Sequence, residues 1–123
     1  MKPITSDRIA KPAGPFSPAV RDGDRLYTSG QIAQDPATGK VIEGGVAAQT
    51  EQIFRNLEAL MSAAGTSFAD VVKVNVYLTD MRDFTAMNEV YARHFEAPYP
   101  ARTTVAVAEL PLGAIIEIEM IAG

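Results

Sequence analysis

Two short segments near the C-terminus carry charged side chains that suit ligand binding and acid–base chemistry. Arg102 lies in the stretch PARTTVAV at residues 100–107, and Glu117 follows fifteen residues later in IEIEM at 116–120. A guanidinium stays charged and grips a carboxylate through paired hydrogen bonds. A glutamate can hold a water molecule and accept its proton. Such a pair suits a small anionic substrate and a hydrolytic water.

Both segments have the alternation that is typical of β-strands. In residues 116–120 the apolar side chains alternate with Glu117 and Glu119, so one face is apolar and the other is acidic. We expect the two strands to pair antiparallel across the turn at 109–113, with their apolar sides together. Four polar side chains would then share the opposite sheet face, namely Arg102, Thr104, Glu117 and Glu119.

Composition narrows the possible classes of protein. The 123 residues suit a single domain over 1–123, with 47% hydrophobic and 21% charged residues as in ordinary globular proteins. The net charge of −4 and the lack of a Lys/Arg cluster argue against nucleic acid as the main partner. With no cysteine, disulfides, thiolate nucleophiles and the usual structural zinc site are excluded. Residues 1–15 contain no apolar segment, so we expect a cytoplasmic protein.

The remaining elements must position the charged segments. Two short strands at 16–20 and 25–29 flank the hairpin signal Asp22-Gly23, and residues 31–45 form a long loop with at most one short strand at 40–42. Apolar residues at helical spacing predict a helix over 46–64, ended by Gly65. A period of two predicts a strand over 70–78, and Thr79-Asp80 can cap a second helix, which ends before Pro98.

This order predicts an α+β fold in which both helices connect strands. Right-handed crossovers would place the two helices on one face of a mixed sheet and leave the other face uncovered. An uncovered apolar face usually marks an interface, so we expect a homo-oligomer with sites between subunits. The apolar residues expected on that face are Val71, Tyr77, Ala106, Ala108, Ile115 and Ile121.

The chain resembles the RidA (reactive intermediate/imine deaminase, YjgF) family over nearly its whole length. The shared segments, in order, are GPFS at 14–17, YTSGQI at 27–32, GGV at 44–46, NL at 56–57, AAG at 63–65, NEVY at 88–91, PAR at 100–102 and IEIE at 116–119. The resemblance implies a chorismate-mutase-like fold, a homotrimer with clefts between subunits, and no metal or organic cofactor. It also implies hydrolysis of reactive 2-enamino or 2-imino acids, such as 2-aminoacrylate, to 2-oxo acids and ammonia in metabolite damage control.

The resemblance further implies roles for particular residues. Arg102 matches the arginine that binds the substrate carboxylate, and Glu117 matches the glutamate that positions or polarises the hydrolytic water. The same cleft would be lined by Phe16, Ser29, Gly30, Asn88 and Thr104. Gly30 and the Thr104 position would offer backbone groups to the ligand.

Two positions depart from the pattern of many family members. Phe16 stands where tyrosine is common, which keeps the ring and removes the phenolic donor. Thr104 stands where cysteine is common, so a thiol-dependent step at that position is excluded. Backbone contacts at the Thr104 position could persist.

Several of these residues also have ordinary structural interpretations. Arg102 could form an ion pair with Glu117 or Glu119, and either glutamate could simply be solvated or interfacial. Asn88 could cap or bridge backbone within its helix. His94, the single histidine, suits packing or a dipole role at the end of its helix, and Ser29 lacks the partners of a serine nucleophile.

Two other functions remain open from the sequence. A trimer of this fold could bind small carboxylates and regulate or buffer them without turnover. A ribonuclease or translation inhibitor is disfavoured by the net charge of −4. The function that fits the residues best is a cofactor-free, homotrimeric enamine/imine deaminase acting on a small-molecule substrate, without nucleic acid or membrane partners.

Overall fold

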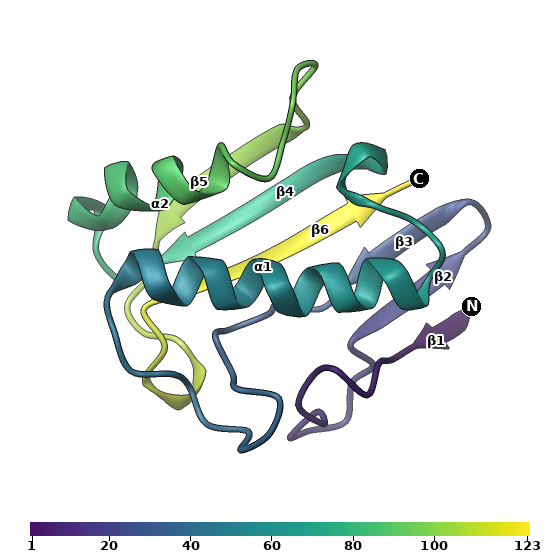
Figure 1. The fold of residues 1–123 in the computed structure, drawn as a ribbon, viewed down its shortest axis with the longest axis horizontal. Helices are drawn as coiled ribbons and strands as arrows, with labels where there is room; N and C mark the ends of the chain where they lie inside the picture. The colour runs from purple at the N-terminus through teal and green to yellow at the C-terminus, as the bar shows by residue number, and fades with distance from the viewer.

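The computed structural model describes residues 1–123. Its strands and helices follow one another in an order close to the predicted one (Figure 1). The elements are β1 (Lys2–Ile4), β2 (Ala19–Asp22), β3 (Arg25–Thr28), α1 (Val46–Ala63), β4 (Val71–Leu78), α2 (Phe84–Tyr91), β5 (Ala101–Ala106) and β6 (Ile116–Ala122). Three short 3-10 helices complete the list: η1 (Phe68–Asp70), η2 (Met81–Asp83) and η3 (Pro111–Gly113). No helix is long and apolar enough to cross a membrane.

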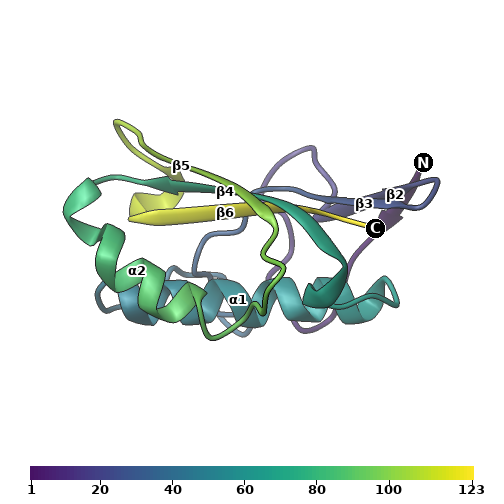
Figure 2. The same ribbon diagram turned by 90° about the horizontal axis from the view of Figure 1, so that it is seen from above.

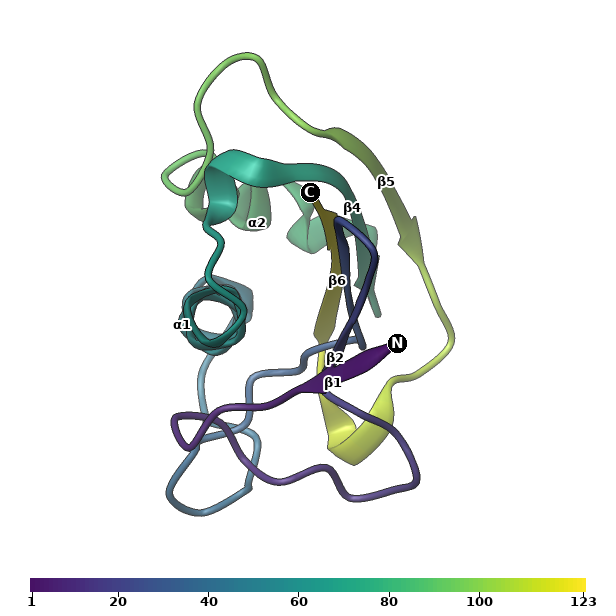
Figure 3. The same cartoon turned by 90° about the vertical axis from the view of Figure 1, so that its right-hand side faces the viewer.

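The six strands form one mixed sheet in the order β1-β2-β3-β6-β4-β5. β4 pairs parallel with β5, whereas β6 runs antiparallel to both β3 and β4, which makes β3 and β4 parallel to each other. The connections β3–α1–β4 and β4–α2–β5 therefore step in the same direction across the sheet. Right-handed crossovers in one direction put both helices on the same face. Figures 2 and 3 show this arrangement, which confirms the predicted layer order.

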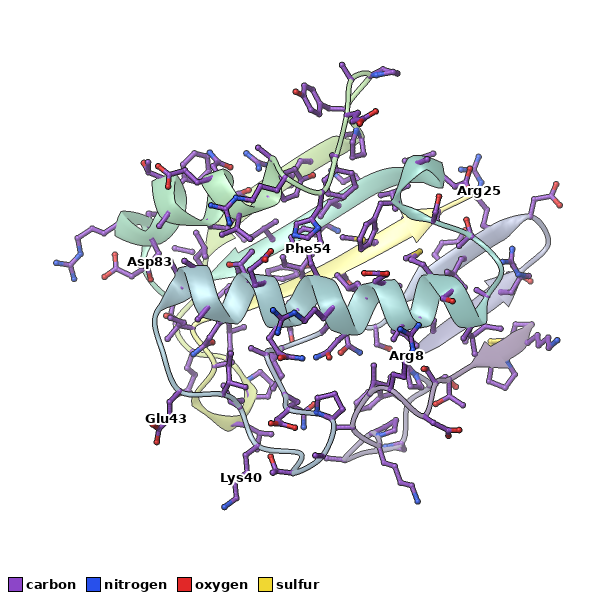
Figure 4. All side chains as sticks on the ribbon, viewed as in Figure 1. Arg8, Arg25, Lys40, Glu43, Phe54 and Asp83 are labelled. Atoms are coloured by element: carbon purple, nitrogen blue, oxygen red, sulfur yellow. The ribbon has the colours of Figure 1, made fainter.

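α1 packs lengthwise on the sheet because its apolar residues recur on one side. Ile53, Phe54, Leu57 and Leu60 are fully buried, and Phe54 lies on the side of α1 that faces α2, where its ring contacts that of Tyr91 (Figure 4). The helix ends as predicted, since Gly65 has a φ of +74° and donates its N–H to the Ser62 carbonyl. α1 therefore covers the same face of the sheet as α2.

α2 starts later than its predicted cap. The Asp80 side chain accepts the Arg82 N–H and caps η2, and α2 itself begins at Phe84. Asp80 is thus a capping residue, as expected, but the helix that it caps is η2, which leads into α2.

The predicted hairpin between the two C-terminal strands is wrong. β4 lies between β5 and β6, because the crossover through α2 makes β5 the parallel neighbour of β4. The register places Arg102 and Thr104 opposite Val74 and Val76, on the helix-covered face. Glu117 aligns with Tyr77 on the uncovered face.

The same register sets Glu119 beside Asn75, on the uncovered face with Glu117. The four polar side chains therefore divide between two faces instead of sharing one. The alternation of apolar residues in β5 does not show which face Arg102 and Thr104 occupy, because β5 is an edge strand with exposed residues on both sides. Its face is set by its neighbour β4.

The uncovered face is partly apolar, as predicted, but with a different membership. Tyr77 and Ile121 lie there, and Tyr27 and Val105 are each 41% exposed. Of the other expected residues, Val71 belongs to the core, Ala106 pairs with Leu78, and Ala108 and Ile115 lie outside the strands. β1 was not predicted, and residues 40–42 form a single bridge between Val41 and Gln34 instead of a strand.

Candidate active site

The guanidinium of Arg102 rests in a cradle made by one side of α2. Phe84, Asn88 and Tyr91 recur at i, i+4 and i+7, so they lie on one face of the helix. Asn88 Oδ1 accepts a hydrogen bond from Arg102 Nη1 at 2.7 Å. Arg102 Cζ lies 4.6 Å from the centre of the Tyr91 ring and 5.5 Å from that of Phe84. These contacts fix the orientation of the cation.

Arg102 has no acidic partner within the chain. The two ion pairs of the structure join Arg82 to Asp80 and His94 to Glu51. The interpretation of Arg102 as an ion-pair partner of Glu117 or Glu119 is therefore wrong. Its side chain borders a cavity of about 350 Å³ lined by Asn88, Tyr91, Ala92, Tyr99, Pro100 and Arg102. The positive charge faces a space that an anion can enter.

Glu117 borders a second cavity, of about 420 Å³, on the other side of the sheet. The cavity is lined by Ala13, Gly14, Phe16, Ser29, Gly30, Ile32, Gln34, Pro111, Leu112 and Glu117. Gln31 and Ile118 exchange backbone hydrogen bonds of 2.8 and 3.0 Å, which hold the segment after β3 against β6. This pairing places Ser29 and Gly30 beside the Glu117 side chain.

Ser29 has a structural task in this cavity. Its hydroxyl donates to the Ser17 carbonyl at 2.6 Å, and its N–H donates to the Pro18 carbonyl at 2.9 Å. Both bonds tie the segment that carries Phe16 to the end of β3. Phe16 is 52% exposed and forms an apolar wall of the cavity. The hydroxyl of Ser29 is thereby committed to the backbone, in agreement with the absence of a nucleophile arrangement.

Glu117 and Glu119 have different surroundings. The Glu119 carboxylate accepts hydrogen bonds from Asn75 Nδ2 at 3.1 Å and from the Tyr77 hydroxyl. The bond to Glu119 raises the pKa of Tyr77 to about 12. Glu117 has no side-chain hydrogen bond, and burial, followed by the negative charge of Glu119, raises its pKa. Glu117 is thus the free carboxyl, and its raised pKa makes it a better proton acceptor.

For the isolated chain, in which no cation faces Glu117, we expect Glu117→Gln to gain stability relative to wild type as the pH rises. The pKa of Glu117 is raised in the folded state. The contribution of this carboxyl to the free energy of unfolding is therefore complete below its unfolded pKa and is lost as the pH rises through its folded pKa. Glutamine cannot ionise and escapes this loss. Urea unfolding of both proteins at about pH 4 and pH 7 measures the effect. A stability difference that is the same at both pH values would contradict the raised pKa, and Glu43→Gln on an exposed loop is the control.

The predicted site residues fall into two groups. Phe16, Ser29, Gly30 and Glu117 line one cavity, whereas Asn88 and Arg102 line the other. Thr104 lies two residues after Arg102 on the same side of β5, and its buried hydroxyl has no hydrogen-bond partner. The two groups lie on opposite faces of the sheet. A single chain therefore does not bring Arg102 and Glu117 together.

Sequence reasoning missed the aromatic part of the Arg102 cradle and the loop at the Glu117 cavity. The signal that could have found Phe84 and Tyr91 is their helical spacing to Asn88. Leu112 lines the Glu117 cavity with a φ of +57°, which nothing in its side chain suggests. His94 does have the expected packing role, since its ring stacks on Phe54 at 4.1 Å and its Nε2 contacts Glu51 Oε1 at 2.6 Å.

A mixed sheet covered by two helices on one face, with a cavity-facing arginine and a free glutamate, defines a small α+β protein with one charged side chain at each of two cavities. The chain matches the family described as Endoribonuclease L-PSP over residues 5–123. It belongs to this family, which is the YjgF/RidA family, and the resemblance noted from the sequence is confirmed.

Relatives and solved structures agree with this membership. A RutC family protein of Pyrococcus horikoshii is 48% identical over 119 residues, covering 97% of this chain and 94% of the relative. The human 2-iminobutanoate/2-iminopropanoate deaminase is 44% identical over 119 residues, covering 97% and 87%. The crystal structure of RidA from the Antarctic bacterium Psychrobacter superposes with a TM-score of 0.95 at 46% identity, covering 99% and 98%.

Proposed function

We propose that this protein hydrolyses reactive 2-enamino and 2-imino acids to 2-oxo acids and ammonia. The observation that carries the proposal is Arg102, a fixed cation that faces a cavity and has no acid of its own chain to neutralise it. A 2-imino acid supplies the missing carboxylate. The human relative bears the name of such a deaminase.

Substrate binding would use the guanidinium fork of Arg102. Asn88 and Tyr91 already hold one edge and one face of this group, so few rotamers are lost when the ligand binds. Each hydrogen bond to a charged group contributes roughly 1.5–3 kcal/mol, far more than an exposed ion pair. The carboxylate is thereby anchored while C2 of the imine stays open to attack.

Hydrolysis then needs one water and one proton shuttle. Water attacks C2, its oxygen bonds to that carbon, and the C=N π electrons move to nitrogen. Glu117 accepts a proton from the water and passes it to the nitrogen of the tetrahedral carbinolamine. Glu117 next takes the proton of the carbinol hydroxyl and delivers it to the amino nitrogen, the C–N bond breaks with its electron pair leaving on ammonia, and the carbinol oxygen becomes the carbonyl of the 2-oxo acid. A Glu117 that is protonated at the start would act first as donor to the imine nitrogen.

We further propose that the working form is a homotrimer with its sites between subunits. Arg102 and Glu117 lie on opposite faces of one sheet, so one complete site needs two chains. The partly apolar uncovered face, with Tyr27, Val105 and Ile121, offers the surface for this association. Each site would combine the Arg102 cavity of one protomer with the Glu117 cavity of its neighbour.

A coupled assay tests the reaction. A serine dehydratase generates 2-aminoacrylate, and pyruvate formation is followed with and without this protein. We expect acceleration, and no acceleration with several imino acids would favour the carboxylate-binding alternative. Mixing inactive Arg102→Ala chains with inactive Glu117→Ala chains tests the shared site, since refolded mixtures should regain activity and a complete failure to do so contradicts it. Salt-dependent RNA cleavage would instead support the ribonuclease alternative.

Gly30→Ala tests the placement of Glu117. A Cβ at residue 30 would lie 2.7 Å from Glu117 Cδ and 3.0 Å from Cγ, so the carboxyl must move. Because the end of a glutamate is flexible, we expect little change in melting temperature but an about tenfold lower kcat from the misplaced group. Gly45→Ala, with no atom within 4 Å of its Cβ, is the matched control. A Gly30→Ala enzyme with full activity would exclude a precise role for Glu117.

A further inference from the structure

Two large apolar residues are exposed at the Glu117 cavity. Phe16 is 52% exposed and Leu112 is 63% exposed, and both line this cavity. A leucine reaches such an exposure only when its side chain, and not its backbone alone, is open to solvent. Ligand pockets are lined mainly by apolar and aromatic side chains, with a few polar groups that orient the ligand. Two accessible apolar side chains beside one free carboxyl have this character.

Leu112 lies in a turn that its side chain does not favour. Its φ of +57° falls in the left-handed region, which glycine and asparagine adopt more readily than leucine. The turn is closed by the Ala114 N–H, which donates to the Pro111 carbonyl at 3.1 Å, and Ala114 itself is buried. Backbone strain of this kind is concentrated at functional sites. Because leucine adds nothing to the stability of this turn, its contribution lies in the side chain.

Two polar side chains of the same cavity are used to hold the backbone. The Ser29 hydroxyl donates to the Ser17 carbonyl at 2.6 Å. Gln34 Nε2 donates to the Gly39 carbonyl at 2.9 Å. A polar substituent of a ligand would lose water in this cavity and find few free partners, whereas an aliphatic substituent gains from leaving water. The walls of the cavity therefore favour an apolar substituent.

We propose that Leu112, together with Phe16, makes the site selective for 2-imino acids with longer aliphatic side chains. This inference rests on the proposed function. C2 of the substrate carries three substituents: the carboxylate binds Arg102, and the nitrogen must reach Glu117 to receive its proton. The third is the side chain, which begins one bond from the carbon that the water attacks and so lies against the remaining walls of the Glu117 cavity. A cavity of about 420 Å³ has room for more than the methyl group of 2-iminopropanoate.

A series of substrates with one to four side-chain carbons tests this selectivity. An L-amino acid oxidase generates 2-iminopropanoate, 2-iminobutanoate, 2-iminopentanoate and 2-iminohexanoate from the corresponding amino acids. Semicarbazide traps the imine that remains, so its loss in the presence of the protein gives kcat/KM for each substrate. We expect kcat/KM of the wild type to rise about threefold with each methylene, or about thirtyfold over the series, because each methylene leaves water.

Leu112→Ala and Leu112→Asn test the residue itself. Alanine removes the apolar wall, whereas asparagine keeps a side chain of similar size and makes it polar. Asparagine also tolerates a positive φ, so its effect cannot be assigned to a disrupted turn. In both variants we expect the ratio of kcat/KM for 2-iminohexanoate to that for 2-iminopropanoate to fall about tenfold, with melting temperatures close to that of the wild type. Met81→Ala should keep the wild-type ratio and is the matched control, because Met81 is an apolar residue of η2, 45% exposed and outside both cavities.

The outcomes distinguish this inference from the proposed function. Calorimetry on the same proteins gives the Kd of the stable 2-oxo acids from pyruvate to 2-oxohexanoate. A Kd that falls along this series in the wild type but not in Leu112→Ala, in a protein that turns over no imine, supports the selective wall and overturns the deaminase. Equal kcat/KM for all four imino acids overturns the inference and leaves the deaminase standing. A chain-length preference that persists in both Leu112 variants overturns the role of Leu112.

Discussion

Arg102→Ala is expected to lower kcat/KM for 2-imino acids about a thousandfold, because two charge-assisted hydrogen bonds of roughly 1.5–3 kcal/mol each are lost. The protein should remain folded, since Arg102 lies on an edge strand and makes a single side-chain hydrogen bond within the chain, to Asn88. Steady-state kinetics in the dehydratase-coupled assay, with circular dichroism of the same samples, measure both results.

Arg102→Lys separates charge from geometry. Lysine keeps the positive charge but cannot form a planar fork or lie flat on Tyr91. We expect it to recover only a small part of the lost activity. Arg82→Ala is the matched control, because the Arg82 side chain is 91% exposed and pairs with Asp80 outside both cavities. Activity that survives in Arg102→Ala would refute carboxylate anchoring by this residue.

Asn88→Asp is expected to lower kcat/KM about a hundredfold without loss of stability. The new carboxylate would replace an amide oxygen that lies 2.7 Å from Arg102 Nη1. It would neutralise the guanidinium and repel the substrate carboxylate, and both effects weaken binding. In the folded state the new carboxylate would be paired with Arg102, which offsets the cost of placing a charge there, so the melting temperature should not fall. Kinetics and thermal unfolding of the same variant measure the two effects.

The control for this variant carries the same charge on the same helix. Thr85→Asp places an aspartate on the exposed side of α2, away from both cavities. We expect it to keep wild-type kinetics, because solvent screens a charge at that position. Equal losses in the two variants would mean that the charge of the helix, and not the neutralisation of Arg102, controls activity.

Local patterns predicted most of the elements but not the pairing that separates the site. The periodicity of α1 and β4, the Gly65 helix end and the Asp22-Gly23 hairpin are local features, and the structure contains them. The order β6-β4-β5 depends on how a crossover through α2 places β5, which involves residues far apart in sequence. The face of Arg102 was mispredicted for this reason.

The site shows the same division between local and distant information. The resemblance implies that Glu117 and Gly30 line the same cleft. In the structure a Cβ added at Gly30 would lie only 2.7 Å from Glu117 Cδ, so the two residues are in contact. The cradle around Arg102 combines β5 with α2, and Tyr91 enters it through a helical face that also packs on Phe54. One side chain thus serves both core and site, which hydrophobic periodicity alone cannot indicate.

The separation of the two charges by the sheet has a thermodynamic consequence for assembly. Within one chain no cation stabilises ionised Glu117, so burial sets its protonation. In the proposed trimer a neighbour's guanidinium approaches that carboxyl and favours its anionic form. Formation of the complex would then release protons, and by linkage alkaline solution would strengthen subunit association while acid would weaken it.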